Sequence, residues 1–510
     1  MTGSQITMLV AMVVYLFVMI GVGIKLSEKN ETMGDFYLAG RKLGPLVTAM
    51  SAEASDMSSW LLMGLPGVAY LTGVADAGWT AIGLAVGTYL NWLIVAKKLR
   101  RYTEKTNSIT LPEFFSNRYR DKNSVLTLIA AIWIIVFFVP YTASGFAACG
   151  KLFNSLFGLD YHAAMILSAI VIMFYTSMGG FLAASTTDFI QSIVMSVALI
   201  VILLFGVSQA GGMGAVMNNA KSLAGYLSLT QIHDAASGTA SPYSALTIAS
   251  TTAWGLGYFG MPHILLRFMA IRDDSKVALS RRVATIWVVI SMSAAVLIGI
   301  VGLGMSHAGT IATLEGSASE TVVVVTAELL SHRGLLAALI AGVVLSGILA
   351  STMSTSDSQL LAASSSVSND ILVKFFHVQK SDKSLLLISR VSLIAIALVG
   401  VLLAWDSNSS VFQIVSFAWA GFGASFGPVV LLALFWKNST RNGAIAGMLT
   451  GGIMIFVWKF LVRPMGGILN IYELLPAFLI ALFVNVIVSL ISGKPSDEIT
   501  AEYDAVTNDR

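Results

Sequence analysis

The segment Ser51-Ala-Glu-Ala-Ser-Asp-Met-Ser-Ser-Trp60 places two carboxylates and four serines inside a stretch that is otherwise apolar enough to cross a membrane. A polar patch at membrane depth is costly unless it binds something. Gly64-Leu-Pro-Gly67 follows it, and such residues let a helix unwind and free its backbone carbonyls. Freed carbonyls are tolerated in a membrane where they line a cavity or an ion path. These residues therefore predict half of a binding site.

A second polar segment runs from Ser351 to Gln359 as Ser-Thr-Met-Ser-Thr-Ser-Asp-Ser-Gln. Residues three and four apart on a helix are neighbours, so Ser351, Ser354 and Ser358, or Asp357 in place of the last, share one face. Hydroxyl and carboxylate oxygens on one face suit a hard cation such as sodium, and carbonyls released in the first segment would complete its shell. The alternative is that these hydroxyls only bond to the carbonyl four residues back.

The composition indicates a polytopic membrane protein. Of the 510 residues, 56% are hydrophobic and 11% are charged, and the mean hydropathy is +0.81, whereas a soluble domain carries about a quarter charged residues. The apolar run 6–24 has neither a basic leader nor a small-residue cleavage site, which favours a retained spanning helix over a signal peptide. Cys149 is the only cysteine, so no internal disulfide is expected. The net charge of +3 indicates no nucleic-acid partner.

Apolar runs of roughly 20 residues, the length that crosses a bilayer, predict an all-α membrane protein with about 13 transmembrane helices. The expected spans are 6–24, 44–71, 77–96, 125–149, 161–179, 188–208, 243–266, 284–305, 335–362, 387–405, 411–436, 443–461 and 472–492. The segments 210–241 and 306–332 are expected to be ordinary external loops, and the polar tail 493–510 is expected to be disordered.

Positive charge indicates the orientation of these spans. All but five of the 30 Lys and Arg residues fall on one side of the arrangement, the exceptions being Lys151, Lys221, Arg333, Lys459 and Arg463. By the positive-inside rule, the N-terminus is outside and the C-terminal tail is in the cytoplasm of a bacterial cell.

Two spans are interrupted in similar ways. Span 44–71 contains Ser51–Gly67, and span 243–266 contains Trp254-Gly-Leu-Gly-Tyr-Phe-Gly-Met-Pro-His263, whose glycines and proline disrupt a continuous helix. If 44–208 and 243–436 are two five-helix repeats, a break falls in the first helix of each, and the odd number of helices inverts one repeat relative to the other. Matched interruptions indicate the midplane site of a transporter. The alternative is a pair of kinked helices with glycines for close packing.

In this arrangement residues 1–492 form a single transporter domain, followed by the tail. The helices 6–24, 443–461 and 472–492 are peripheral to the two repeats.

The quoted segments resemble the sodium:solute symporter family, and most closely its sodium/proline symporters. The resemblance is carried by Ser51–Gly67, Trp254–His263, Met353-Ser-Thr355 and the region of Tyr141, and it extends from about residue 8 to about residue 490. It implies the inverted-repeat fold of the leucine transporter, and a sodium ion that drives uptake of one solute by alternating access around a central site. The solute it implies is L-proline.

By position, the resemblance implies one sodium site made of three backbone carbonyls and two hydroxyls. They belong to Ala54, Met57, Ser351, Ser354 and Thr355. Asp56 matches an essential carboxylate of the family, which supports sodium binding without necessarily touching the ion. Arg41 lies in a functionally sensitive stretch just before the first broken span.

The resemblance also implies substrate positions, and two further residues would line the same cavity. The matched positions are Tyr141, Trp254, Tyr258 and Pro262, and the two neighbours are Ser58 and Trp60. An imino acid suits them, because its ring offers apolar faces and its secondary ammonium can lie over an aromatic ring. Its carboxylate can point at the N-terminus of a half-helix. At each aromatic position the alternative is plain packing.

This chain departs from the proline-symporter pattern at three positions. Glu53 and Ser59 stand where glycine is expected, and Ser351 stands in an alanine-rich turn. The shape of the pocket therefore differs, and the alternative substrate is another small carboxylate-bearing solute.

A second cation site is also expected. Asp357 stands where some sialic acid symporters of the family carry a serine of a second sodium site, and Asp188 matches the acidic residue of that site. We therefore expect Asp188, Ser354, Asp357 and Ser358 to hold a second cation, or a proton in its place because two acids repel. The other interpretation is that Asp357 pairs with a Lys or Arg at the cytoplasmic end, or faces water.

Other classes of function are less consistent with these residues. The chain shows no Gly-x-Ser-Gly or Gly-x-Gly-Asp sequence of a membrane hydrolase, so an enzyme is not expected. A channel would carry charge rings or a carbonyl filter, and the short tail leaves no room for a signalling domain. His263 is either a proton carrier or a local hydrogen-bonding residue. The expected partners are sodium, proline and the lipid bilayer, with no obligate protein partner.

Overall fold

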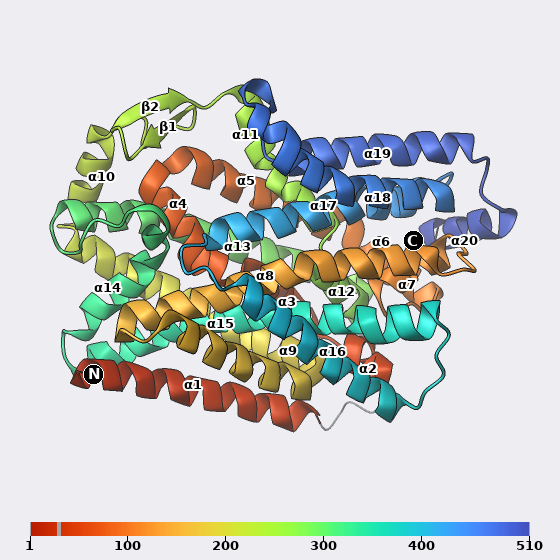
Figure 1. Cartoon of the computed structure of the whole chain (residues 1–510), viewed down its shortest axis with the longest axis horizontal. Coiled ribbons are helices and arrows are strands. Elements are labelled where there is room, and N and C mark those ends of the chain that lie inside the picture. The colour runs from red at the N-terminus through yellow and green to blue at the C-terminus, as the bar shows by residue number, and fades with distance from the viewer. Residues whose placement is uncertain (1, 28–31, 509–510) are drawn as a thin grey trace.

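Long helices lie side by side along the longest axis of the computed structural model, which describes residues 2–27 and 32–508 (Figure 1). Helix α1 (Gly3–Ser27) begins at the same end as the hairpin of β1 (Gln231–Asp234) and β2 (Thr239–Pro242). The last helix, α20 (Asp497–Asn508), lies at the opposite end. We call these the hairpin end and the tail end.

The first half of the chain contains one broken span and its neighbours. Its further helices are α2 (Met33–Leu38), α3 (Pro45–Ser59), α4 (Leu65–Thr72), α5 (Val74–Leu90), α6 (Ala96–Lys105), α7 (Leu111–Arg118), α8 (Val125–Phe157), α9 (Tyr161–Gln209) and α10 (Met213–Ser222). The π-helical turns Trp60–Gly64 and Asn91–Val95 join α3 to α4 and α5 to α6.

The second half contains the other broken span. Its helices are α11 (Ala245–Thr252), α12 (Pro262–Ala270), α13 (Val277–His307), α14 (Val322–Ser331), α15 (Leu335–Ser365), α16 (Asp382–Leu403), α17 (Val411–Phe435), α18 (Arg441–Val457) and α19 (Leu474–Ile491). The 3-10 turn Ala253–Phe259 joins α11 to α12. In the antiparallel hairpin, Gln231 lies opposite Pro242 and Asp234 opposite Thr239.

Within residues 2–27 and 32–508, ten helices are long and apolar enough to cross a membrane. They coincide with ten of the predicted spans. The other predicted spans fall on the broken pair α3–α4, on the broken pair α11–α12 and on the shorter apolar stretch Tyr161–Ser177. An interrupted helix has no single continuous run of sufficient length, so the count of 13 stays a prediction.

Helix α9 holds the predicted spans 161–179 and 188–208 without a loop between them. Gly180 separates them with φ 65° and ψ −177°, a non-helical conformation that glycine adopts at little cost. The chain therefore kinks at one residue, and the two spans are halves of one interrupted helix.

The expectation of ordinary loops is wrong for two segments. Segment 210–241 contains α10 and the hairpin, and segment 306–332 contains the 3-10 turn Gly316–Thr321 and α14. Glu320 of that turn is buried and forms a 2.9 Å ion pair with Lys151. Its carboxylate also accepts hydrogen bonds from the backbone N–H of Val411 and Phe412 at 3.1 Å. These contacts fix the segment to the helices beneath it.

The expectation of a disordered tail is also wrong. Helix α20 docks at the tail end, where Tyr503 and Val506 are each only 8% exposed. These two residues are three positions apart and so share one face of the helix. Arg120 pairs with Glu502 at 2.6 Å and with Glu498 at 3.3 Å. The tail is polar in composition, but its few apolar residues have the spacing needed to pack.

The two broken helices meet in the middle of the bundle. Helix α3 packs against α9, α12, α13 and α15, while the turn Ala253–Phe259 packs against α5 and α17. At Gly257 in this turn, an added Cβ would lie 2.0 Å from Nε1 of Trp419. Because Gly257 has no side chain, the unwound segment can approach α17 closely. This packing explains why a glycine stands at this position of the break.

Candidate cation and substrate site

The break in the first span occurs at Ser58. Its φ of 47° and ψ of −171° are non-helical, and positive φ is unfavourable for a residue other than glycine. The Ser58 hydroxyl accepts a 3.1 Å hydrogen bond from the backbone N–H of Trp60. Such strain persists where the surroundings impose it, and it is frequent at ligand sites.

Backbone carbonyls just before the break accept bonds from other elements. Tyr141 of α8 donates its hydroxyl to the Asp56 carbonyl at 3.0 Å. Ser354 of α15 donates to the Ala54 carbonyl at 2.8 Å and also lies 3.2 Å from the Ser351 carbonyl. The predicted pairing of the two polar segments is therefore present, because α3 and α15 bring their oxygens together.

The remaining predicted sodium ligands lie in the same region. Thr355 is 2% exposed, and its hydroxyl has no hydrogen-bond partner within the described part of the chain. The Met57 carbonyl accepts a bond from the N–H of Trp60 across the break. A cluster of buried carbonyl and hydroxyl oxygens is a ligand set for a hard monovalent cation.

Beside these oxygens lies a small cavity of about 10 Å³, room for about one water molecule. Asp56, Met57, Trp60, Tyr141 and Trp254 line it. Four of these are predicted ligand or substrate residues, and Asp56 is the predicted supporting carboxylate. Because Met57 also borders the oxygen cluster, the regions predicted to bind the cation and the substrate share a wall.

Three further residues, which the sequence did not suggest, line the same cavity. They are Leu84, Val415 and Trp419. Trp419 donates its Nε1–H to the Trp254 carbonyl at 2.7 Å and lies edge-on to Tyr258 at 5.0 Å between ring centroids. A tryptophan within a glycine-rich apolar span carries no local signal for a binding role, so only the packing of α17 on the second break reveals it.

Tyr258 contacts the site through Asp56. Its hydroxyl donates to Asp56 Oδ2 at 2.5 Å, and both side chains are buried. The carboxylate of the first broken helix is thereby held by the second broken helix. The predicted residue Ser58 is buried at the break and makes the local bond described above.

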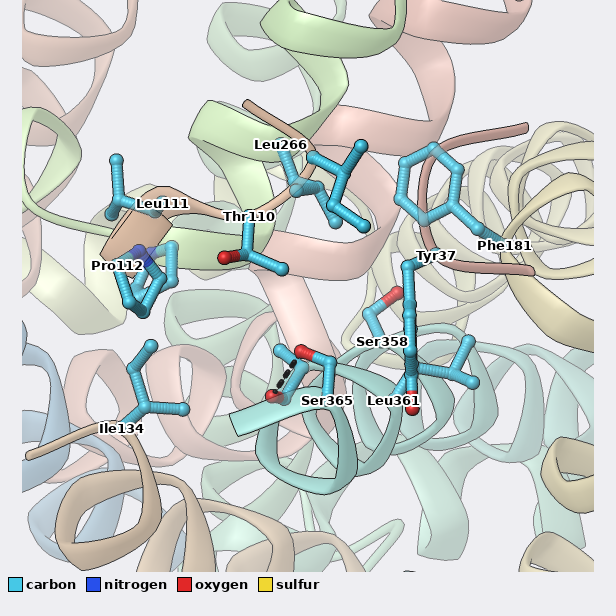
Figure 2. A pocket seen from close by; sticks show the side chains of 13 residues that line it. Tyr37, Thr110, Leu111, Pro112, Ile134, Phe181, Leu266, Ser358, Leu361 and Ser365 are labelled. Atoms are coloured by element: carbon cyan, nitrogen blue, oxygen red, sulfur yellow. Dashed lines mark hydrogen bonds between the residues drawn. The ribbon is translucent and has the colours of Figure 1, made fainter. Parts of the chain in front are cut away.

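Pro262 lies elsewhere. It lines a second cavity of about 20 Å³ toward the tail end, together with Tyr37, Phe181 and Ser358 (Figure 2). The proline begins α12 just after the break. Of the six predicted substrate residues, it is therefore the one found on the far side of the unwound segment.

An aromatic layer covers the small cavity on the side of the hairpin end. Trp60 lies 5.6 Å from Trp254 and 5.8 Å from Phe412 between ring centroids, and Tyr472 stacks on Trp254 at 5.2 Å. Above this layer is a vestibule of about 1040 Å³ that also reaches Trp254. The molecule is thus open from the hairpin end down to the aromatic layer.

Three of the four residues expected at the second cation site, Asp188, Asp357 and Ser358, come together around a residue that the sequence did not suggest. The fourth, Ser354, bonds to the Ala54 carbonyl instead. Asp188 of α9 forms a 3.0 Å ion pair with Arg267 of α12. Ser51 donates its hydroxyl to the same carboxylate oxygen at 2.7 Å. Ser358 lies 2.5 Å from Arg267 Nη2 and donates to Asp357 Oδ1 at 3.1 Å. Asp357 is fully buried, so it does not face water.

Arg267 was missed because it follows the predicted end of span 243–266 and counts as a loop charge there. The structure buries it to 1% exposure, over the ring of Phe181 at 4.9 Å. The available signal was its position among Ile264-Leu-Leu-Arg-Phe-Met-Ala270, since a lone charge within an apolar stretch needs a buried partner.

The departures from the family pattern lie beside the small cavity rather than among its lining residues. Glu53 is buried and accepts a 3.0 Å hydrogen bond from Trp92 Nε1. Ser59 is fully buried in the same helix. His263, near the start of α12, bonds through Nε2 to the Ser55 carbonyl of α3 at 3.1 Å.

Arg41 ties the start of the first broken span to its neighbours. Its guanidinium donates to the carbonyls of Met269 at 2.7 Å, Thr103 at 2.9 Å and Ser108 at 2.6 Å. Burial, reinforced by the charge of Arg100, lowers the pKa of Arg41 to about 10. The group therefore stays charged at neutral pH, and it links the segment before α3 to α6 and α12.

Comparisons with known proteins agree with this geometry. The sequence model of the sodium:solute symporter family matches residues 36–451. A sodium/proline symporter of Staphylococcus aureus is 39% identical over 500 residues, covering 97% of this chain and 94% of that protein. The high-affinity proline transporter PutP of Bacillus subtilis (strain 168) is 41% identical over 488 residues, covering 95% of this chain and 98% of that protein.

Solved structures show the same fold. A substrate-bound, outward-open Na+-coupled sialic acid symporter superposes with a TM-score of 0.77 at 16% identity, covering 96% of this chain and 99% of that one. A nucleobase-cation-symport-1 family transporter in a closed conformation gives a TM-score of 0.54 at 13% identity, covering 92% and 98%. The fold is therefore that of inverted-repeat symporters with a broken helix opening each repeat.

The family model and these relatives define a membrane-embedded, multi-pass secondary transporter and not an enzyme. The chain belongs to the sodium:solute symporter family, whose model covers most of its length.

Proposed function

We propose that this protein carries out sodium-coupled uptake of L-proline by alternating access. The support is threefold: two relatives of about 40% identity over nearly the full chain are named for proline transport, oxygens gather at the break of α3, and an aromatic cavity adjoins them. The observation that carries the proposal is the shared wall at Asp56 and Met57, since a cation bound on one side would shape the solute cavity on the other.

The proposed sodium site consists of the Ala54, Met57 and Ser351 carbonyls with the Ser354 and Thr355 hydroxyls. Its support is the 2.8 Å contact of Ser354 with the Ala54 carbonyl and the hydroxyl of Thr355, which has no hydrogen-bond partner among residues 2–27 and 32–508. A sodium ion there would be held by lone pairs of the Ser354 hydroxyl and the Ala54 carbonyl, with the hydroxyl proton turned away from the carbonyl that it now bonds to. Asp56 lies one residue before Met57 and supplies negative charge nearby.

The proposed substrate site uses the aromatic groups around the small cavity. Trp60, Tyr141 and Trp254 line it, and Tyr258, Ser58 and Pro262 flank the two breaks. Aromatic faces suit a pyrrolidine ring and its ammonium, while unpaired N–H groups at a helix break suit a carboxylate. The cavity of about 10 Å³ must expand to admit a solute, and ion binding at the shared wall is the step that expands it.

The domain organisation we propose has repeat one at about 44–208 and repeat two at about 243–436, within the single domain 1–492. Helices 6–24, 443–461 and 472–492 lie outside the repeats. The support is the position of each break in the first helix of its repeat.

In the cell we propose a bacterial cytoplasmic membrane, with the hairpin end outside and the tail 493–510 in the cytoplasm. The support is the concentration of Lys and Arg in segments that share the tail end. In this orientation the vestibule of about 1040 Å³ faces the outside. A sodium ion crossing 100 mV supplies roughly 2.3 kcal/mol, enough for about a fiftyfold solute gradient.

We also propose that Asp188, Asp357 and Ser358 form a second cation-binding site. Its support is the burial of both carboxylates, which are linked through Ser358 and Arg267 and require a positive partner. Replacing Asp357→Ser removes one charge, and an unchanged sodium dependence, Hill coefficient and pH profile would contradict a role for this residue.

The experiment for the main proposal is uptake of labelled proline into proteoliposomes with and without an inward sodium gradient. Unlabelled amino acids, sugars and short carboxylates serve as competitors. We expect sodium-dependent uptake that proline alone blocks. Uptake blocked better by another small carboxylate would favour the alternative substrate, and the Glu53 and Ser59 departures would then be the first positions to revert to glycine.

A further inference from the structure

A polar pocket of about 260 Å³ lies at the tail end, away from the proposed ion and solute sites. It is formed where α18 begins, where α19 leads into the segment before α20, and by Tyr119 just after α7. Helices α18 and α19 lie side by side here (Figure 1). An added Cβ on Gly443 would be 1.9 Å from Ser489 Oγ, so the two helices approach closely near these ends. Both are long and apolar enough to cross a membrane, and the pocket therefore lies at the membrane surface.

Two basic side chains line this pocket. Arg441 bonds through Nε to the buried Asp121 carboxylate at 2.8 Å, and its side chain is 34% exposed. A guanidinium held through Nε still presents its two Nη groups as donors. Lys494, which follows α19, is exposed. Within the described part of the chain, no carboxylate is among the lining residues, so the lining carries positive charge.

The pocket adjoins an apolar surface. Leu490 and Ile491 come directly before the lining residues 492–495, and they are 67% and 77% exposed. At the end of a membrane-spanning helix, such side chains contact acyl chains, which are as apolar as they are. The basic pocket thus begins where the acyl chains of the bilayer would end and the headgroups would start.

We infer that this pocket binds the phosphate of an anionic phospholipid, with the acyl chains along the end of α19. Guanidinium and ammonium donors recognise phosphate, and basic pockets between membrane-spanning helices hold anionic headgroups. A zwitterionic lipid fits less well, because its ammonium would meet Arg441 and Lys494 with no lining carboxylate to hold it. A free phosphate ion offers the same donors the same chemistry, but it leaves the apolar surface uncovered.

A bound headgroup would also contact the C-terminal helix, since Ile499 of α20 lines the pocket. The lipid would therefore help to hold α20 against the membrane-spanning helices. The competing explanation is a water-filled crevice in which Arg441 serves only to neutralise Asp121. In that case the charge of the headgroup makes no difference to the protein.

The experiment measures lipid binding to the purified full-length protein in a neutral detergent, by native mass spectrometry and by the unfolding temperature. The probes are phosphatidylglycerol, phosphatidylcholine with the same acyl chains, and inorganic phosphate. For the wild type we expect retained phosphatidylglycerol and a rise in unfolding temperature that the other two probes do not reproduce. Lys494→Gln is expected to weaken phosphatidylglycerol binding about fivefold, the contribution of one basic group near an anionic headgroup.

Two further variants make the test specific to the pocket. Asn442→Trp fills the pocket from an exposed position without changing its charge, and it is expected to abolish the stabilisation by phosphatidylglycerol. Lys383→Gln is the matched control, because it removes an exposed lysine in the first turn of α16 that does not line the pocket. This control is expected to bind phosphatidylglycerol as the wild type does.

Equal binding of phosphatidylglycerol to the wild type, Lys494→Gln and Asn442→Trp would overturn the inference. Equal stabilisation by phosphatidylcholine would also overturn it, since the pocket would then not select negative charge. Inorganic phosphate that stabilises the wild type as well as phosphatidylglycerol does would assign the pocket to a soluble anion and overturn the lipid assignment. Because the measurements use neither sodium nor proline, these outcomes are independent of the proposed transport function.

Discussion

At the scale of single residues, the site is held by hydrogen bonds between the two broken helices and their neighbours. The buried Asp56 carboxylate receives the Tyr258 hydroxyl at 2.5 Å. An ionised acceptor makes such a bond stronger than one between neutral groups, and a cation at the proposed site would favour the ionised form of Asp56. Tyr258 therefore links the conformation of the second broken helix to the carboxylate nearest the proposed sodium ion.

Replacing Tyr258→Phe removes that donor. We expect a loss of about 1.5–3 kcal/mol in stability, the range for a hydrogen bond to a charged group, together with weaker coupling of sodium to proline uptake. The matched control is Tyr161→Phe, whose hydroxyl donates to the neutral Ala404 carbonyl at 2.7 Å far from the site, with a loss of about 1 kcal/mol. Thermal unfolding in detergent compares the two, and equal losses would contradict a charged acceptor.

Ser354→Ala tests the proposed sodium site directly. Loss of a ligand oxygen worth about 1.5–3 kcal/mol is expected to raise the sodium concentration for half-maximal uptake by roughly tenfold or more. Ser346→Ala is the control, since this serine of the same helix is buried and bonds to the Gly342 carbonyl one turn back at 2.9 Å. Sodium titrations of proline uptake that shift equally in both variants would rule out a specific role for Ser354.

At the scale of elements, the unwound turn between α11 and α12 depends on close approach to α17. A Cβ on Gly257 would meet Trp419, a large ring fixed by its bond to the Trp254 carbonyl. The same ring lines the proposed solute cavity. The contact between Gly257 and Trp419 therefore sets both the packing of the unwound turn and the shape of the proposed solute cavity.

Gly257→Ala is expected to destabilise the protein by about 1–3 kcal/mol, the usual cost of overpacking, and to lower the apparent affinity for proline. Gly21→Ala is the control, because this helical glycine of α1 has nothing within 4 Å of its added Cβ. Unfolding temperature and proline saturation curves measure the effects. A Gly257→Ala protein with wild-type values in both would refute the close packing of the turn.

At the scale of the whole molecule, the two ends differ in how open they are toward the proposed central site. The vestibule of about 1040 Å³ opens at the hairpin end, while the cavity on the side of the tail end measures about 20 Å³. The aromatic layer of Trp60, Trp254 and Phe412 separates the vestibule from the proposed solute cavity. Alternating access then requires this layer to part on one side and α12 to move on the other.

The orientation can be measured with single cysteines, because native Cys149 is buried. In right-side-out vesicles, a membrane-impermeant maleimide is expected to label Ser237→Cys in the exposed hairpin turn and to leave exposed Ser496→Cys, just before α20, unlabelled. Inverted vesicles should give the reverse pattern, and the native chain serves as the unlabelled control. Labelling of Ser496→Cys alone in right-side-out vesicles would reverse the proposed topology.

The sequence alone determined the membrane class, the positions of the breaks and the pairing of the Ser51–Trp60 and Ser351–Gln359 segments. These follow from local properties: apolar run length, helix-breaking residues, and oxygens too costly to leave unpaired in a membrane. The same local logic failed for the tail, where two apolar residues three positions apart suffice to dock a short helix.

Tertiary structure alone decided which distant groups meet. Trp419 enters the cavity and Arg267 enters the acidic cluster because α17 and α12 pack there, at separations of many residues along the chain. Pro262 matched a family motif, yet it lies beyond the break in another cavity. Composition and periodicity report what a residue costs to bury, while the identity of its partner depends on the packing of helices that the sequence does not place side by side.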